Sequence, residues 1–427
     1  MKSSLRAVLG RSADPASLVA FRVAFGILAS VAAARFVLLG WVDELLVQPT
    51  FHFTWVPGLA VPPAPALYGL HLVQFLAGTF VALGRWTRPA LAVWLLAFGA
   101  VELLDKTLYL NHHVLFMLLG FWLWLAPVGR LRMTGGPPVA LGWLWLLRAQ
   151  VASVYVWAGL AKLDADWLLR GEPLHTWLSA RQDLPVLGPL LAAPSLALGM
   201  SWLGALYDLG IPLLLLCSRT RTLALVLVAG FHITVGMLFP IGIFPLLMMV
   251  SATLFCRPDW PRRWGGGGVE PGAAVVRAPR GLPWILAVAL MWLIPGRFLL
   301  FDTDVNWTGR GYRFAWRVML TEKTGMVDYR VVDQDTGRIW RTTPTPDLTP
   351  LQHQHMRTQP DMIRDYALHL ARRHEAEGRR VAVYAESYAS LNGRPAQRLL
   401  RPDVDLTKPL DVLWGAGWVL PLEHAVE

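Results

Sequence analysis

The chain contains 427 residues, of which 55% are hydrophobic and only 16% are charged. Soluble domains carry about one quarter charged residues, so this composition excludes an ordinary soluble fold and favours a protein embedded in a lipid membrane. A net charge of +10 is also typical of nucleic-acid-binding proteins. We expect no nucleic-acid partner, however, because many arginines lie in short clusters between long apolar runs, as in the loops of membrane proteins.

Nine apolar windows, each long enough or nearly long enough to cross a bilayer, occupy residues 1–300. They must be helical where they face lipid, because hydrocarbon offers no hydrogen bonds to the backbone. We therefore predict a mostly α-helical, polytopic membrane bundle with about nine transmembrane helices. The windows are 18–40, 66–83, 89–104, 110–126, 141–161, 196–216, 222–239, 241–256 and 282–300. Arg22 and Arg35 interrupt the first window, which argues against a cleaved signal peptide.

The loops between these windows alternate in charge. Arginine clusters follow the second, fourth, sixth and eighth windows, whereas the loop at 41–65 carries Asp43, Glu44 and His52 and no Lys or Arg. By the positive-inside rule, the arginine-rich side is cytoplasmic, so we predict a cytoplasmic N terminus and a cytoplasmic Gly-rich linker at about 261–281. The remaining loops and the chain from residue 301 onward then share the extracytoplasmic compartment.

Both cysteines, Cys217 and Cys256, follow apolar windows beside arginines. That position predicts the reduced cytoplasmic side, where a stabilising disulfide is not expected. No ligand cluster with metal-site spacing occurs, so we predict no metal.

The pattern changes at residues 301–427. Segments 327–332 and 338–343 alternate like strands around a turn, and Asn392-Gly393 separates two further β-rich runs as in a hairpin. Residues 360–376 have the character of a helix. We therefore predict a small soluble α+β extracytoplasmic domain, and the chain shows no internal repeat of the kind found in many transporters.

The densest group of ionisable residues lies where the third and fourth windows meet, around the sequence LLDKTLYLNHH at 103–113. Such groups are costly near a membrane and therefore indicate a functional site. If desolvation lowers its pKa, the Lys106 amine is neutral and can act as a base. The alternative is a snorkelling lysine paired with Asp105 or Glu102. The other candidates in this group are Asn111, His112 and His113.

Four candidates lie elsewhere. His52 sits among aromatic residues in FHFTW, which could form an apolar pocket or anchor the chain at the interface. Lys162 and Asp166, in AGLAKLDADW, could pair locally or face the same cavity as Lys106. His232 is a weaker candidate because a lone histidine in an apolar segment usually serves packing. Asp208, also inside an apolar window, is expected to pair with a group such as a buried arginine.

Five motifs make the chain resemble the vitamin K-dependent gamma-glutamyl carboxylase family, including its bacterial members. They run in family order along nearly the whole chain: DPASLVAFRVAFG at 14–26, LLDKTLYLNHH at 103–113, AGLAKLDADW at 158–167, FHITVGMLFPIGIFPLLMMVSATLFCRPDWPRRW at 231–264 and NWTGRGYRFAWRVML at 306–320. The resemblance implies a bacterial inner-membrane enzyme.

The resemblance also implies the chemistry. Reduced vitamin K or menaquinol is deprotonated and reacts with O2 to an epoxide through a strong base. That base removes a γ-proton from a glutamate side chain of a protein or peptide, and CO2 captures the carbanion. The lysine of the family's DKT motif starts the reaction, and it is Lys106 here. Cationic groups for a glutamate carboxylate are available at Arg310, Arg313 and Arg317, without an assignment among them.

One position departs from the family pattern. Where the family places a histidine a few residues before its NWT-like segment, this chain has Phe298. Two alternatives therefore stay open beside the carboxylase: an enzyme that oxygenates a quinol without fixing CO2, and a non-catalytic membrane transporter or scaffold.

Overall fold

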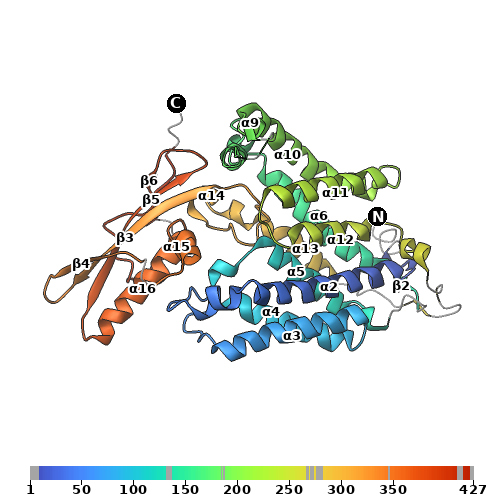
Figure 1. The fold of residues 1–427 in the computed structure, drawn as a ribbon, viewed down its shortest axis with the longest axis horizontal. Helices are drawn as coiled ribbons and strands as arrows, with labels where there is room; N and C mark the ends of the chain where they lie inside the picture. Colours follow the sequence, from blue (N-terminus) through green and yellow to red (C-terminus); the bar gives the residue numbers. More distant parts are fainter. Residues whose placement is uncertain are drawn as a thin grey trace.

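Two parts follow one another along the long axis of the molecule, a helical bundle and a small sheet domain at one end (Figure 1). The computed structural model describes residues 9–130, 137–183, 185, 188–265, 269, 274–275, 282–344, 347–410 and 417–423. Among them the architecture is mostly helical with one small C-terminal sheet, as predicted.

Every predicted apolar window contains a helix, but the helices differ in length. Six are long and apolar enough to cross a bilayer: α2 (Ala16–Leu38), α3 (Ala64–Leu83), α4 (Thr87–Leu104), α6 (Gly142–Ala161), α10 (Pro194–Leu216) and α11 (Arg221–Leu238). Three are shorter: α5 (Asn111–Leu125), α12 (Phe244–Ala252) and α13 (Leu282–Leu293).

The three shorter helices fall below the length that a typical single crossing requires. A helix of 15 residues, such as α5, rises only about 22 Å, whereas the hydrocarbon core is about 30 Å thick. The apolar run of α12 continues in a 3-10 turn, η4 (Thr253–Phe255), and that of α13 in η6 (Pro295–Leu300). By length and composition, six of the nine predicted segments in the described chain qualify as membrane spans.

Short elements connect the long helices. They are β1 (Ser12–Ala13), η1 (Asp43–Val47), η2 (Lys106–Leu108), η3 (Val128–Arg130), β2 (Val139–Ala140), α7 (Ala165–Leu168), α8 (Leu174–Ser179), α9 (Gly188–Leu191), η5 (Trp260–Trp264) and α14 (Val305–Thr308). The predicted linker at 261–281 therefore begins inside a 3-10 turn, and most of its remainder lies outside the described residues. Cys217 and Cys256 are both free thiols.

Helices α2 and α3 pack backbone to backbone. A Cβ atom added at Gly26 would lie 2.4 Å from the backbone nitrogen of Ala82, and one added at Gly78 would lie 2.8 Å from that of Ser30. Small residues are the usual means by which membrane helices approach so closely, because lipid provides little hydrophobic drive for association. Helices α2 and α3 therefore form a closely packed pair, and both contribute residues to the wall of the cavity described below.

We expect Gly26→Ala to lower the thermal unfolding temperature in detergent. The new methyl group meets backbone atoms that cannot move aside, so overpacking should cost about 1–3 kcal/mol. Gly69→Ala is the matched control because a Cβ there meets nothing within 4 Å in the same helix pair. Equal melting temperatures for the two variants would contradict the tight α2–α3 contact.

The C-terminal domain is a four-stranded antiparallel sheet in the order β4-β3-β5-β6. Its elements are β3 (Lys323–Asp333), β4 (Ile339–Thr342), α15 (Pro350–Met356), α16 (Pro360–Ala376), β5 (Val381–Leu391) and β6 (Gln397–Arg398). The predicted strands at 327–332 and 338–343 pair through Val331 and Trp340, and the predicted helix at 360–376 is α16. Asn392 and Gly393, with φ of 50° and 75°, form the predicted turn between β5 and β6.

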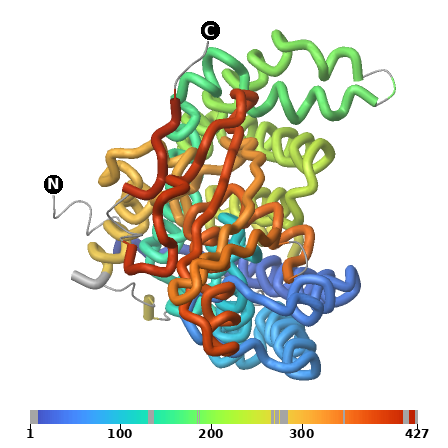
Figure 2. Tube along the Cα trace, turned by 90° about the vertical axis from the view of Figure 1, so that its left-hand side faces the viewer, coloured from blue at the N-terminus to red at the C-terminus, as the bar shows by residue number. Residues whose placement is uncertain are grey.

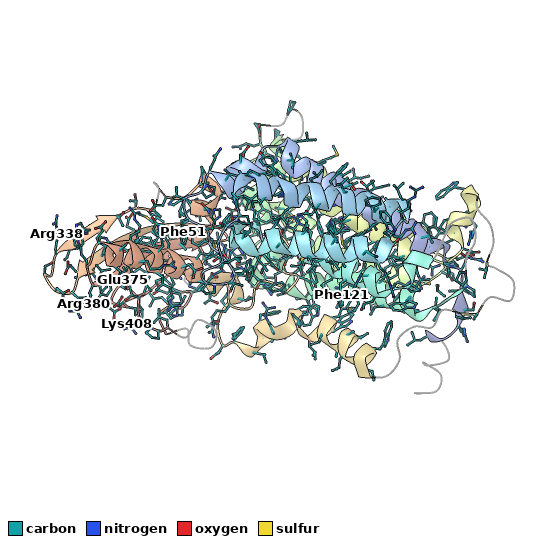
Figure 3. The ribbon with its side chains drawn as sticks, turned by 90° about the horizontal axis from the view of Figure 1, so that it is seen from below. Phe51, Phe121, Arg338, Glu375, Arg380 and Lys408 are labelled. Atoms are coloured by element: carbon teal, nitrogen blue, oxygen red, sulfur yellow. The ribbon has the colours of Figure 1, made fainter. Side chains whose placement is uncertain are left out.

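Helix α16 packs on one face of this sheet, and the domain covers one end of the bundle (Figure 2). Its core contains the fully buried Tyr329, Val331 and Tyr366. Phe53, from the loop after α2, belongs to the same core. Phe51 of that loop lies between the bundle and the domain, far from the exposed Arg338 and Arg380 at the domain's outer end (Figure 3).

Candidate active site

Lys106 lies in a tight turn where α4 ends. The chain leaves the helix at Asp105, whose Oδ1 accepts hydrogen bonds from the backbone nitrogen of Thr107 at 2.9 Å and from its hydroxyl at 2.8 Å. The backbone nitrogen of Lys106 in turn donates to the carbonyl of Phe53 at 2.8 Å. An aspartate capping a turn in this way is a local sequence effect. The hydrogen bonds to Asp105 and to Phe53 together hold the backbone around Lys106 in place.

Asp105 also joins the bundle to the C-terminal domain. Its side chain is fully buried, and Oδ2 accepts from the Gln352 amide at 2.8 Å and lies 3.4 Å from Nδ1 of His52. Burial raises the pKa of Asp105, but the hydrogen bonds from His52, Thr107 and Gln352 outweigh it and lower the pKa below its usual value. Asp105 is therefore a fixed anion that orients the turn, and His52 is part of this support.

The Lys106 amine points to two carboxylates on α16. Nζ lies 2.5 Å from Oδ2 of Asp365 and 3.4 Å from Oδ2 of Asp361, and the lysine side chain is only 13% exposed. Arg313 donates to the same Asp361 oxygen at 2.8 Å and to Oε1 of Gln359 at 2.6 Å. The expected partners of a snorkelling lysine, Asp105 and Glu102, are bonded to other groups, so the expected pairing is wrong.

The two α16 carboxylates are not equivalent. Burial raises the pKa of Asp361, but Arg313 and Lys106 outweigh it, so the pKa falls below its usual value. Burial also raises the pKa of Asp365, and its contact with Lys106 does not offset that effect. Nearby negative charges stabilise an ammonium group. The Lys106 amine thus lies between two carboxylates of different acidity.

A cavity of about 630 Å³ opens beside this turn, between the bundle and the C-terminal domain. Its wall includes Thr107 and Leu108 of the turn, and His355 of α15 covers it from the domain side. Among the described residues its wall does not include Lys106, whose amine points to α16. The volume falls within the range of about 300–1,000 Å³ that small-molecule sites occupy.

Polar groups gather on one side of this mostly apolar cavity. His113 pairs with Glu102 at 2.8 Å, and the ring of His112 packs against that of His113. The Asn111 side chain receives a hydrogen bond from Tyr109 at 2.8 Å and donates to the carbonyl of Arg317 at 3.2 Å. The cavity wall contains Glu102, Asn111, His112, His113 and Arg317 together. It combines apolar surface with a few fixed polar groups.

Phe298 lies close to this wall, although the family resemblance places a histidine at its position. The guanidinium carbon of Arg317 lies 5.0 Å from the centre of the Phe298 ring, and Nε of Arg317 donates to Asn306 at 3.1 Å. A phenyl ring offers this cation a π-face but neither donates nor accepts a proton. At this position the chain therefore has no titratable side chain beside Arg317.

A second cavity of about 130 Å³ contains Lys162 and His232. Lys162 pairs with Asp208 at 2.7 Å, so the partner of Asp208 is a lysine rather than the expected arginine. His232 and Tyr155 share a hydrogen bond of 3.0 Å. The two cavities are neighbours, since Phe244, Val318 and Met319 line both. Lys162 and His232 thus face a different space from the polar groups near Lys106.

Asp166 holds the C-terminal domain to the bundle. Both of its oxygens accept from Arg394 at 2.6 Å, and Asn392 of the β5–β6 turn donates to it at 2.9 Å. Burial raises the pKa of Asp166, but these hydrogen bonds outweigh it and lower the pKa. The bidentate geometry identifies a structural contact between the domains. Asp166 is not among the residues that line the large or the small cavity.

The structure thus separates the sequence candidates into four places. His52, Asp105 and Lys106 surround the turn, Asn111, His112 and His113 line the large cavity, Lys162 and His232 line the small one, and Asp166 lies at the contact between the domains. Sequence reasoning missed Asp361, Asp365 and His355 of the C-terminal domain. The four-residue spacing of the two aspartates puts them on one helix face. Solvent-exposed helices commonly show the same spacing of charges, so it does not identify a site. No group of three or more potential metal ligands occurs in the part of the chain that the structure describes.

Two family models match the chain. One, described as HTTM domain, matches residues 10–260, and the other, described as vitamin K-dependent gamma-carboxylase, lumenal domain, matches residues 282–425. No solved structure matches the chain. The first match covers the bundle up to η5 and the second covers α13 and the sheet domain, so both parts of the molecule are accounted for. With six helices fit to cross a bilayer, this integral membrane protein belongs to the vitamin K-dependent gamma-carboxylase family.

Proposed function

We propose that this protein carboxylates glutamate side chains of a protein or peptide, using reduced vitamin K or menaquinol together with O2 and CO2. The observation that supports the proposal best is the position of Lys106. It occupies a turn that Asp105 fixes, beside a ligand-sized cavity and beneath the family's lumenal domain.

The large cavity fits a reduced quinone. Its walls are mostly apolar, and His112, His113 and Asn111 supply groups able to hydrogen-bond a quinol. When bound, the quinol supplies the electrons for O2 reduction and the strong base that the γ-proton requires. Residues of both the bundle and the sheet domain line this space, and water must be kept out of it during the reaction because bulk water would quench such a base.

Lys106 is proposed as the group that accepts the first proton. The carboxylates of Asp361 and Asp365 lie within ion-pair distance of its amine, and a base must be uncharged when it accepts a proton. Arg313, which pairs with Asp361, and Arg317, which lines the cavity, are cations that suit the carboxylate of a substrate glutamate.

The membrane orientation is part of the proposal. Arg11, Arg221 and Arg257 line one cavity at the end of the bundle away from the sheet domain. We therefore assign that end to the cytoplasm of a bacterial inner membrane, with the sheet domain outside. Protease protection of the domain in sealed, right-side-out vesicles would contradict this orientation.

The decisive assay measures quinone epoxide and fixed CO2 in the same reaction. Purified protein is incubated with reduced vitamin K, a glutamate-rich peptide and labelled CO2. The proposal expects both products in a fixed ratio. Well-folded protein that makes neither would overturn it.

A second candidate is quinol oxygenation without CO2 fixation. Phe298 favours it, because the family pattern has a proton-carrying histidine where this chain has a phenyl ring beside Arg317. Epoxide formation without labelled CO2 would select this candidate. Phe298→His should then increase CO2 fixation relative to epoxide, whereas an unchanged ratio would remove Phe298 from the explanation.

Asp365→Asn is expected to shift the rising limb of the pH–rate profile to lower pH. The substitution keeps the size of the side chain but removes a negative charge 2.5 Å from the Lys106 amine. The ammonium then loses stabilisation, so the neutral amine forms at a pH lower by about one unit. Epoxidation measured between pH 6 and about 10 tests the shift.

Asp328→Asn is the matched control because Asp328 is exposed on β3 and has no contact with Lys106. Its profile should follow that of the wild type. A shift of the Asp365→Asn profile toward higher pH would mean that this carboxylate assists deprotonation more than it stabilises the ammonium.

A further inference from the structure

A third cavity, of about 490 Å³, lies at the end of the bundle furthest from the sheet domain. Its walls come from the short β1 strand, the start of α6, the first residue of α11 and the segment 255–259 after α12. These elements are near the ends of membrane-spanning helices, where lipid headgroups meet the protein.

Two partly buried arginines face one another across this cavity wall. Arg148 donates to the carbonyls of Leu254 at 2.7 Å and Cys256 at 3.0 Å. Arg221 donates to the carbonyls of Leu215 at 2.9 Å and Leu216 at 3.1 Å. Main-chain carbonyls fix both guanidinium groups in place but carry no full negative charge. The two like charges therefore remain uncompensated by these bonds.

The carboxylates of the same cavity are already engaged. Asp14 accepts from Arg262, which stands outside the lining, at 3.0 Å, and Asp259 pairs with Arg257 at 3.2 Å. The lining contains four arginines and two aspartates, a formal charge of +2. Among the described contacts, neither Arg148 nor Arg221 has a carboxylate within ion-pair distance.

We propose that this cavity binds the phosphate group of an anionic phospholipid. Guanidinium groups are suited to phosphate oxygens because they donate two parallel hydrogen bonds. Arg148 lies in the second turn of α6 and Arg221 is the first residue of α11, so both are close to the ends of apolar helices where headgroups meet the protein. Leu141, Ala13 and Phe255 provide apolar wall for the adjoining glycerol and acyl segments. A free phosphate ion would use the arginines alone.

The test compares lipids on the purified full-length protein. Native mass spectrometry counts retained phosphatidylglycerol and phosphatidylcholine, and thermal unfolding in detergent is followed with added phosphatidylglycerol, phosphatidylcholine or inorganic phosphate. We expect phosphatidylglycerol to be retained and to raise the unfolding temperature. The Arg148→Gln/Arg221→Gln double variant should bind it about tenfold more weakly or worse.

Arg219→Gln is the matched control, since Arg219 is exposed on the same turn, carries the same charge and is not part of the cavity wall. It should retain the lipid. Arg221→Gln alone provides a milder variant if the double variant does not fold, and it should show partial loss. Equal lipid retention by wild type and the Arg221→Gln variant, equal loss in Arg219→Gln, or equal retention of phosphatidylcholine would overturn the site. Stabilisation by inorganic phosphate as large as that by phosphatidylglycerol would overturn the assignment to a lipid.

Discussion

Lys106→Ala should lose both quinone epoxide and fixed CO2, with rates reduced by at least about 100-fold, the lower range for removal of a general base. The two products should fall together because the proton that Lys106 accepts precedes both. A small primary amine added to the assay should restore part of the activity, since the alanine leaves space between the turn and α16. Simultaneous measurement of epoxide and labelled CO2 tests this.

Lys408→Ala is the control for loss of a lysine, because Lys408 is exposed at the outer end of the sheet domain (Figure 3). It should keep full activity. Retention of epoxidation in a folded Lys106→Ala protein would assign the first proton transfer to another group, and His113 would be the next candidate in the cavity.

Asp166→Ala should destabilise the contact between the bundle and the sheet domain more than any other single substitution considered. It leaves the Arg394 guanidinium, 12% exposed, without its bidentate partner, and losing one member of such a pair costs about 3 kcal/mol. The unfolding temperature should fall, and limited proteolysis should release the sheet domain. Activity should fall as well, because Asp361 and Asp365 move with that domain.

The pH dependence provides an internal check on the same pair. The folded-state pKa of Asp166 is depressed, so its stabilisation is present above the ordinary aspartate pKa and is lost as the pH falls through the lower, folded-state value. The stability difference between wild type and Asp166→Ala should therefore shrink under acid. Asp335→Ala, which breaks an exposed pair with Arg380, should leave stability nearly unchanged at every pH.

The elements of the fold were largely predictable because they depend on local patterns. Alternating residues at 327–332 and the Asn392-Gly393 pair specify strands and a turn through short-range geometry. The lengths of α5, α12 and α13 were not predictable in the same way. Hydropathy gives the length of an apolar run, but it does not show where an α-helix ends within that run. The 3-10 turn η4, which continues the run of α12, is as apolar as the helix before it.

The site was predictable only up to the turn that carries Lys106. Asp105 and Thr107 are its sequence neighbours, so their roles follow from the motif. The partners of the amine, Asp361 and Asp365, are 255 and 259 residues further along the chain. The sequence of a charged helix does not indicate which of its aspartates contact a loop of the helical bundle. The same limit applies to Asp208, whose partner Lys162 was considered only for other roles.

The two family matches divide this chain at about residue 270, yet the lysine and its counter-ions come from opposite sides of that division. Neither half therefore contains both the amine and the two carboxylates of α16. Either half expressed by itself would lack one side of this arrangement, so the interface between the halves is what brings these three groups together.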